Sequence, residues 1–140
     1  MQGKEAICAK IDVMRGYYFE LIEAMEDISL EQYMSSNLIR RGTERIIQLV
    51  IECATDINCM MLKDMGRPAP KDYFNSFIEM GEAEILPMDF VLAIAPSTGL
   101  RNILVHEYQK LDNKIVFRSV QSIKDMYVVY MDQLIVYLGC

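Results

Sequence analysis

The sequence of 140 residues is poor in the side chains that bind metals: it has one histidine, His106, and four cysteines without any C-x-x-C pair. We therefore expect no zinc site. The sequence also contains no Gly-rich phosphate loop, no H-E-x-x-H motif and no nucleophile elbow. These absences argue against P-loop, zinc-protease and serine-hydrolase chemistry, and no cofactor or metal is predicted.

Long apolar runs are missing as well. No stretch approaches the roughly 18 to 20 apolar residues of a membrane helix, and the first residues lack the apolar segment of a signal peptide. We therefore expect a cytoplasmic protein with no membrane partner. The cysteines are expected to be reduced and mostly structural: Cys8, Cys53, Cys59 and Cys140.

The sequence has fewer basic than acidic residues. Fourteen Lys and Arg residues face twenty Asp and Glu residues, which gives a net charge of −6. Binding of duplex nucleic acid over a whole surface rests on phosphate neutralisation, so no DNA partner is expected and any RNA contact must be local. The candidates for such a contact are Arg40, Arg41 and Arg45 in one stretch, with Arg101 and Lys110 on either side of the histidine.

Apolar residues make up 52% of the chain, and three segments carry them at alternating spacings of four and three. These segments run from Ile7 to Ile28, from Ile39 to Met60 and from Val116 to Tyr137. Such spacing places the apolar side chains on one face of a helix. No segment of comparable length alternates with period two, so we predict an all-α fold in a single domain, residues 1–140.

Capping residues and prolines set the expected helix limits. The expected helices are Lys4–Asp27, a short helix from Leu30 with a Ser29/Gln32 capping box, a long helix from the N-cap Asn37 to Gly66, Lys71–Gly81, a helix from Pro87 to a break at Pro96, a helix capped by Ser97, and a last helix after Asp112-Asn113.

The long helix is apolar around most of its circumference, which predicts that other helices cover it on several sides. Beyond its main stripe it carries further apolar residues on other faces, namely Ile47, Leu49, Ile51, Ala54 and Met61. One small domain can hardly supply that much cover. We therefore expect a homodimer formed partly on this helix, with a central helix in a monomeric bundle as the alternative.

The segment Arg101-Asn-Ile-Leu-Val-His106-Glu-Tyr108 unites a fixed cation, a group that titrates near neutrality and a phenol. RNA carries its own nucleophile, the 2′-hydroxyl, so cleavage needs proton transfer, which suits His106, and charge stabilisation, which suits Arg101. Asn102 shares a helix face with the histidine. One imidazole does not easily act as acid and base at once, whereas a symmetric dimer brings two to one site.

Simpler interpretations of the motif stay open. A lone histidine on a helix is more often a structural residue than a catalyst. Arg101 could pair with Glu107 or Glu84, and Tyr108 could simply pack.

A second polar line lies on the long helix, formed by Glu44, Gln48 and Thr55 with Glu52 and Asp56 beside it. Glu44 could orient an active-site arginine. Thr55 and Glu52 are interpreted as a solvated or interfacial face.

The segment from Thr98 to Tyr108 closely resembles the R-x4-H-x-Y signature of the HepT-like branch of the HEPN superfamily. The stretch from Arg41 to Asp56 resembles the long second helix of that family, and Asp112-Asn-Lys-Ile-Val116 also fits. The resemblance implies an all-α HEPN-type homodimer with a cleft at the interface, lined by the motif from both chains. It also implies a metal-independent endoribonuclease that acts as a toxin. Attack by the 2′-hydroxyl is expected to leave 2′,3′-cyclic phosphate ends.

By the same resemblance, Arg101 and His106 are the catalytic pair and Asn102 assists them. The implied partner is a minimal nucleotidyltransferase (MNT-type) antitoxin, as in a type VII-like toxin–antitoxin module. That partner is expected to transfer AMP from ATP to Tyr108 and so silence the cleft, because a phosphate beside the catalytic pair occupies the place of the RNA backbone.

Two further interpretations compete with the nuclease. In the first, the protein is a non-catalytic helical dimer that docks the nucleotidyltransferase and is modified by it. In the second, the motif only packs at an interface. Under the nuclease interpretation Glu44, Arg41 and Arg45 are candidates for support of the site or for RNA contact.

Overall fold

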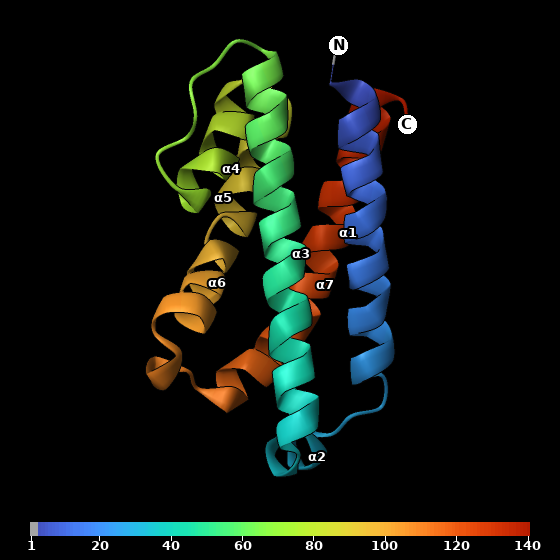
Figure 1. The fold of residues 1–140 in the computed structure, drawn as a ribbon, viewed down its shortest axis with the longest axis vertical. Coiled ribbons are helices and arrows are strands. Elements are labelled where there is room, and N and C mark those ends of the chain that lie inside the picture. Colours follow the sequence, from blue (N-terminus) through green and yellow to red (C-terminus); the bar gives the residue numbers. More distant parts are fainter. Residues whose placement is uncertain (1–2) are drawn as a thin grey trace.

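The structure is a computed structural model that describes residues 3–140 (Figure 1). Within these residues every regular element is a helix, so the predicted all-α fold is confirmed. The elements are α1 (Lys4–Met25), α2 (Leu30–Ser35), α3 (Asn37–Asp64), α4 (Tyr73–Glu82), α5 (Met88–Ile94), α6 (Ser97–His106), the short 3-10 helix η1 (Tyr108–Lys110) and α7 (Asn113–Leu138).

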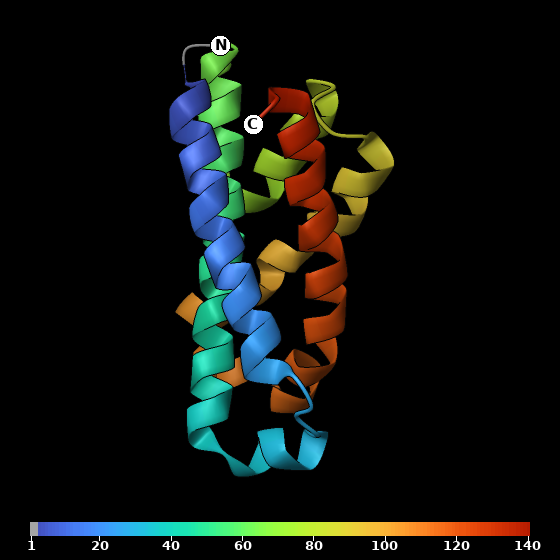
Figure 2. The ribbon, with the colours of Figure 1, turned by 90° about the vertical axis from the view of Figure 1, so that its right-hand side faces the viewer.

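The three long helices form the body of the molecule. Helix α1 packs along α3 and α7, and the shorter helices α4 and α6 pack against α3 from another side (Figure 1). Figure 2 shows that the start of α1 and the end of α7 lie at the same end of the bundle. Most of the predicted stripes of α1 and α7 face the core and are buried: Ile7, Ile11, Met14, Tyr18 and Leu21 on α1, and Val116, Val120, Ile123, Tyr127, Tyr130 and Leu134 on α7. At the ends of the stripes Met25 and Ile28 are half-buried and Tyr137 is exposed.

Helix α3 is covered on several sides, as predicted, but the cover comes from its own chain. Of the residues outside its main stripe, Ile47, Ile51, Ala54 and Met61 are fully buried, whereas Leu49 is half-buried. Because α4 and α6 pack on the side of α3 that α1 leaves open, a partner chain is not needed to bury these side chains. The burial of these side chains therefore gives no support to the homodimer, which stays a prediction to be argued from the motif.

Two expected caps are replaced by neighbouring residues. The N-cap of α3 is Ser36, whose hydroxyl accepts a hydrogen bond from the Ile39 N–H, so Asn37 is the first helical residue. Ser97 does not cap α6. It lies inside the helix, and its hydroxyl contacts the Ile94 carbonyl and the Tyr127 hydroxyl. The capping box of Ser29 with Gln32 is confirmed.

Other helix limits shift by a few residues. Helix α1 ends at Met25, and Asp27 beyond it has a positive φ of 58°. Helix α3 ends at Asp64, before Gly66 at φ 79°, a backbone conformation that suits glycine. Helix α4 begins at Tyr73 because the Asp72 carboxylate caps it.

Contrary to the expectation from the sequence, residues Met88–His106 are long and apolar enough, by length and composition, to span a membrane, with a mean hydropathy of 1.2. In the fold this stretch is divided into α5 and α6, which meet at Ala95 and Pro96. Both pieces pack in the bundle, α5 against α4 and α6 against α3. The stretch therefore supplies core side chains to the bundle, such as Val91, Ile94 and Leu104.

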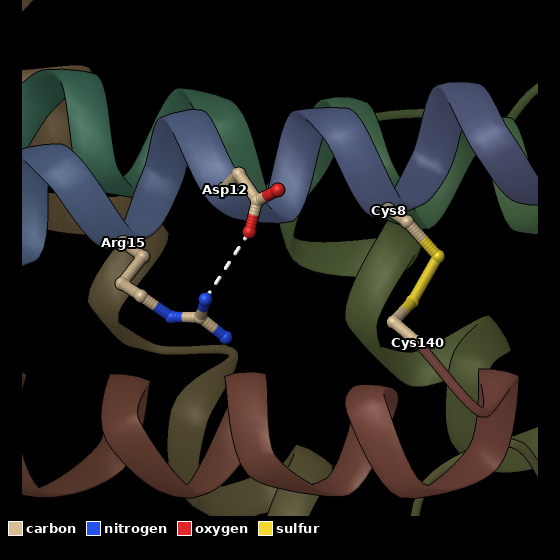
Figure 3. Close-up of a disulfide and its surroundings, with 4 residues drawn as sticks. All are labelled: Cys8, Asp12, Arg15 and Cys140. Carbon is tan, nitrogen blue, oxygen red and sulfur yellow. Dashed lines mark hydrogen bonds and ion pairs between the residues drawn. A yellow bond between two sulfur atoms is a disulfide. The ribbon is translucent and has the colours of Figure 1, made fainter.

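Cys8 and Cys140 form a disulfide with a Cα–Cα distance of 6.0 Å (Figure 3). The expectation of four reduced cysteines was therefore wrong for this pair. The two residues are 132 positions apart and meet only because α1 and α7 pack with these ends together, which no local spacing reveals. Cys53 and Cys59 are free, and burial raises the pKa of both thiols.

Reduction of this disulfide is expected to lower the free energy of unfolding by about 2–4 kcal/mol, because the cross-link restricts the unfolded chain. Urea unfolding with and without reductant measures the effect, and Cys140→Ser should match the reduced wild type. Cys59→Ser, which removes a free thiol, is the control. Equal unfolding midpoints for the oxidised and reduced protein would contradict the prediction.

Candidate functional site

The motif occupies the end of α6 and the first residue of η1. Arg101, Asn102 and His106 belong to α6, and Tyr108 begins η1 immediately beyond it. The buried side chain of Leu104 anchors this helix against the core. The motif is thus held on a short helix that packs directly on α3.

Arg101 is fixed by two partners on other helices. Its Nε donates to Glu52 Oε2 at 2.9 Å, and the distance from its terminal NH2 nitrogen to the same oxygen is 2.8 Å. Its guanidinium carbon lies 4.5 Å from the centre of the Tyr73 ring, a cation–π contact. The Arg101 side chain is 13% exposed, so these contacts set its orientation at the edge of the core.

These contacts correct the sequence analysis at two points. Arg101 pairs with neither Glu84 nor Glu107, and Glu107 instead pairs with Lys110 at 3.2 Å. Glu52, interpreted from sequence as solvated or interfacial, is the partner that holds Arg101.

The polar line on α3 divides into members that face the motif and two, Thr55 and Asp56, that do not. Asp56 forms an ion pair with Lys10 of α1 at 3.3 Å. Gln48 donates to Glu52 at 3.3 Å, so Glu44, Gln48 and Glu52 follow each other at four-residue spacing on the face toward α6. Thr55 is fully buried and donates to the Glu52 carbonyl, which corrects its interpretation as part of a solvated or interfacial face.

Tyr108 forms the second link between the motif and α3. Its hydroxyl donates to Glu44 Oε1 at 2.6 Å. This hydrogen bond is the main cause that raises the pKa of Tyr108, followed by burial and the negative charge of Glu44, while Arg41 and Arg40 lower it. Glu44 therefore contacts the tyrosine of the motif and not its arginine.

Two cavities flank Tyr108. One has a volume of about 230 Å³ and is lined by Arg41, Glu44, Arg45, Gln48, Leu104 and Tyr108. The other, of about 210 Å³, is lined by Asn37, Arg40, Arg41, Tyr108, Leu111 and Asn113. The sequence-predicted group of Glu44, Arg41 and Arg45 is thus brought together with Tyr108.

The arginines beside Tyr108 differ in how they are engaged. Arg40 donates to the carbonyls of Tyr33 and Met34 and to Asn37, and so fixes the turn between α2 and α3. Arg41 and Arg45 are exposed and form no ion pair within residues 3–140. These two cations are available to an anionic ligand.

His106 and Asn102 stand apart from these contacts. Both are exposed, and within residues 3–140 no hydrogen bond joins either side chain to Arg101 or Tyr108. The structure therefore places the arginine and the tyrosine against α3 and leaves the histidine open to solvent. In the described part of the chain no group of three His, Cys, Asp or Glu side chains is placed to hold a metal ion.

Comparison with known proteins agrees with the motif. The family described as Ribonuclease HepT-like matches residues 14–132. The chain is 38% identical over 123 residues to the tRNA nuclease HepT of Aphanizomenon flos-aquae, covering 88% of this chain and 84% of that protein.

Solved structures show the same fold. The tri-AMPylated HEPN toxin of Shewanella oneidensis, solved in complex with its MNT antitoxin, superposes with a TM-score of 0.82 at 22% identity, covering 91% of this chain and 95% of that one. A toxin–antitoxin structure with AMP-PNP also has a TM-score of 0.82, at 21% identity, covering 91% and 96%.

The family match includes the whole segment from Arg101 to Tyr108 and the stretch of α3 that contacts it. The expected resemblance is thereby confirmed. The chain belongs to the Ribonuclease HepT-like family.

Proposed function

We propose that this protein, as one HepT-like domain over residues 1–140, is a metal-independent endoribonuclease and the toxin of a toxin–antitoxin module. The observation that carries the proposal is the motif on α6, with Arg101 held by Glu52 while His106 is open to solvent. The 38% identical relative, a tRNA nuclease, supports RNA as the substrate class.

The chemistry follows from the residue types. His106 transfers protons to and from the 2′-hydroxyl and the leaving 5′-oxygen, Arg101 stabilises the negative phosphorane, and Asn102 assists on the exposed face. Because one imidazole cannot easily fill both proton-transfer roles, we propose a homodimer that brings two copies of the motif to one cleft. Val105, which is 38% exposed between Asn102 and His106, gives this face an apolar contact for the second copy.

Regulation is proposed to act on Tyr108. An MNT-type antitoxin would transfer AMP to its hydroxyl, and the exposed Arg41 and Arg45 beside it would hold the added phosphate. The solved relative from Shewanella oneidensis is AMPylated and bound to such an antitoxin, which supports this part of the proposal. The proposed place of action is the cytoplasm.

The test of the nuclease is incubation of the purified wild-type protein with total RNA in the presence of EDTA. We expect cleavage that leaves 2′,3′-cyclic phosphate ends, identified by end-group analysis. Intact mass first shows that Tyr108 is unmodified. Intact RNA after incubation with the unmodified protein would contradict the proposal and favour the non-catalytic docking dimer.

A further inference from the structure

Tyr108 and Glu44 form a contact that the motif alone does not contain. The phenol donates to Glu44 Oε1 over 2.6 Å, although the two residues are 64 positions apart. Tyr108 is 45% exposed, whereas Glu44 is only 6% exposed. Tyr108 is therefore a residue open to solvent whose hydroxyl donates to a carboxylate that is not.

The Glu44 carboxylate uses only one of its two oxygens for the Tyr108 hydrogen bond. Its second oxygen, Oε2, is buried and has no hydrogen-bond partner within residues 3–140. The carboxylate also makes no ion pair there. An unpartnered buried carboxylate oxygen is costly, and it stays free to accept a further hydrogen bond.

The charged and titratable groups that face the Tyr108–Glu44 pair come from α2 and α3. Tyr33 of α2 has a pKa raised to about 12 by burial and by the negative charge of Glu44, so it stays neutral at ordinary pH. Arg41 and Arg45 of α3 line the same cavity as the pair. Arg40 is occupied by the carbonyls at the end of α2.

We propose that Glu44 is the proton acceptor for Tyr108 when the tyrosine takes up AMP, an inference that rests on the AMP transfer proposed above. The Tyr108 oxygen forms a bond to the α-phosphorus of a nucleoside triphosphate, and the bond from that phosphorus to the departing pyrophosphate oxygen breaks. The phenolic proton passes to Glu44 and then to solvent. Arg41 and Arg45 neutralise the phosphate oxygens.

A carboxylate that accepts the phenolic hydrogen bond without accepting the proton during the reaction would slow AMP transfer to Tyr108, whereas a proton acceptor speeds it. The hydrogen bond to Glu44 raises the pKa of Tyr108. If the ionised phenolate were the sole nucleophile, removing the carboxylate would leave more phenolate and speed the reaction. A proton acceptor instead lets the neutral phenol react, so removing it slows the reaction.

The experiment uses an adenosine that carries an electrophile, 5′-(4-fluorosulfonylbenzoyl)adenosine, and the protein alone. The sulfonyl sulfur of the reagent forms a bond to the Tyr108 oxygen, fluoride leaves, and the phenolic proton goes to Glu44. Peptide mass spectrometry measures the rate of labelling at Tyr108. At pH 7 we expect Glu44→Gln to label about a hundredfold more slowly than the wild type. The variant's rate should rise about tenfold per pH unit as the phenol ionises, whereas the wild-type rate should change little around neutrality.

Matched variants separate a chemical effect from a folding effect. Glu44→Asp retains a carboxylate and should recover part of the rate, while Tyr108→Phe gives the background. Glu107→Gln removes an exposed carboxylate next to the tyrosine in sequence and should label like the wild type.

Equal or faster labelling of Glu44→Gln would overturn the inference, as would a wild-type rate that follows only phenol ionisation. Because the probe needs neither RNA nor the antitoxin, this result is independent of the RNA cleavage test. If labelling depended on Glu44 but the protein cleaved no RNA, the proposed nuclease activity would be contradicted and the proposed role of Glu44 would be retained.

Discussion

RNA cleavage is expected to fall by about 10²- to 10⁴-fold when His106 is replaced by alanine, because proton transfer by a positioned side chain contributes about that much. The fold should be unaffected. His106 is exposed, and a surface substitution away from special features changes stability by less than about 0.5 kcal/mol. Initial cleavage rates in EDTA and urea unfolding of the same preparations provide both measurements.

The matched control is Gln109→Ala, an exposed position in η1 three residues further along the chain. It should cleave RNA like the wild type. If His106→Ala cleaved at the wild-type rate, histidine catalysis would be wrong. A clear loss of stability in His106→Ala would favour the interpretation in which the motif only packs.

Arg101→Lys is expected to lower the cleavage rate by about 10²- to 10³-fold although the positive charge is kept. In the wild type, the Nε and a terminal nitrogen of the guanidinium both contact Glu52 Oε2, and the guanidinium lies over the Tyr73 ring. A lysine ammonium is a compact point charge that cannot reproduce this arrangement. The cleavage rate at saturating RNA, together with the KM, distinguishes lost transition-state stabilisation from weaker binding.

Two companion variants make this result specific. Arg15→Lys changes an arginine in an exposed ion pair with Asp12 (Figure 3) and should have no effect on cleavage. Glu52→Gln keeps Arg101 but weakens the contact that orients it, so its rate should lie between those of Arg101→Lys and the wild type. Full activity of Arg101→Lys would mean that any cation suffices at this position.

The sequence predicted most of the helices because their signals are local. The stripe from Ile7 to Leu21 is buried as its spacing predicts, since a residue's place on a helix face depends only on its neighbours in the chain. Ser97 failed as a predicted cap for a related reason. Its role is decided by Tyr127, 30 residues away, which no local pattern contains.

The candidate site was predictable only in part. The candidate residues themselves, from Arg101 to Tyr108, stand in one short segment, so the sequence alone groups them. Their partners are Glu52 and Glu44, which lie 49 and 64 positions from Arg101 and Tyr108. Which of the many carboxylates on α3 meets which motif residue depends on how α6 docks, and that is a property of the packed bundle.

The two carboxylates that receive the motif are eight residues apart on one helix, Glu44 toward Tyr108 and Glu52 toward Arg101. At 1.5 Å per residue they are about 12 Å apart along the axis of α3, a little over two turns. The spacing of Glu44 and Glu52 on α3 therefore sets the distance between Tyr108 and Arg101. Inserting a single residue between Glu44 and Glu52 would rotate one carboxylate by about 100° around the axis of α3 relative to the other. Only one of the two contacts, Glu44 with Tyr108 or Glu52 with Arg101, could then be kept.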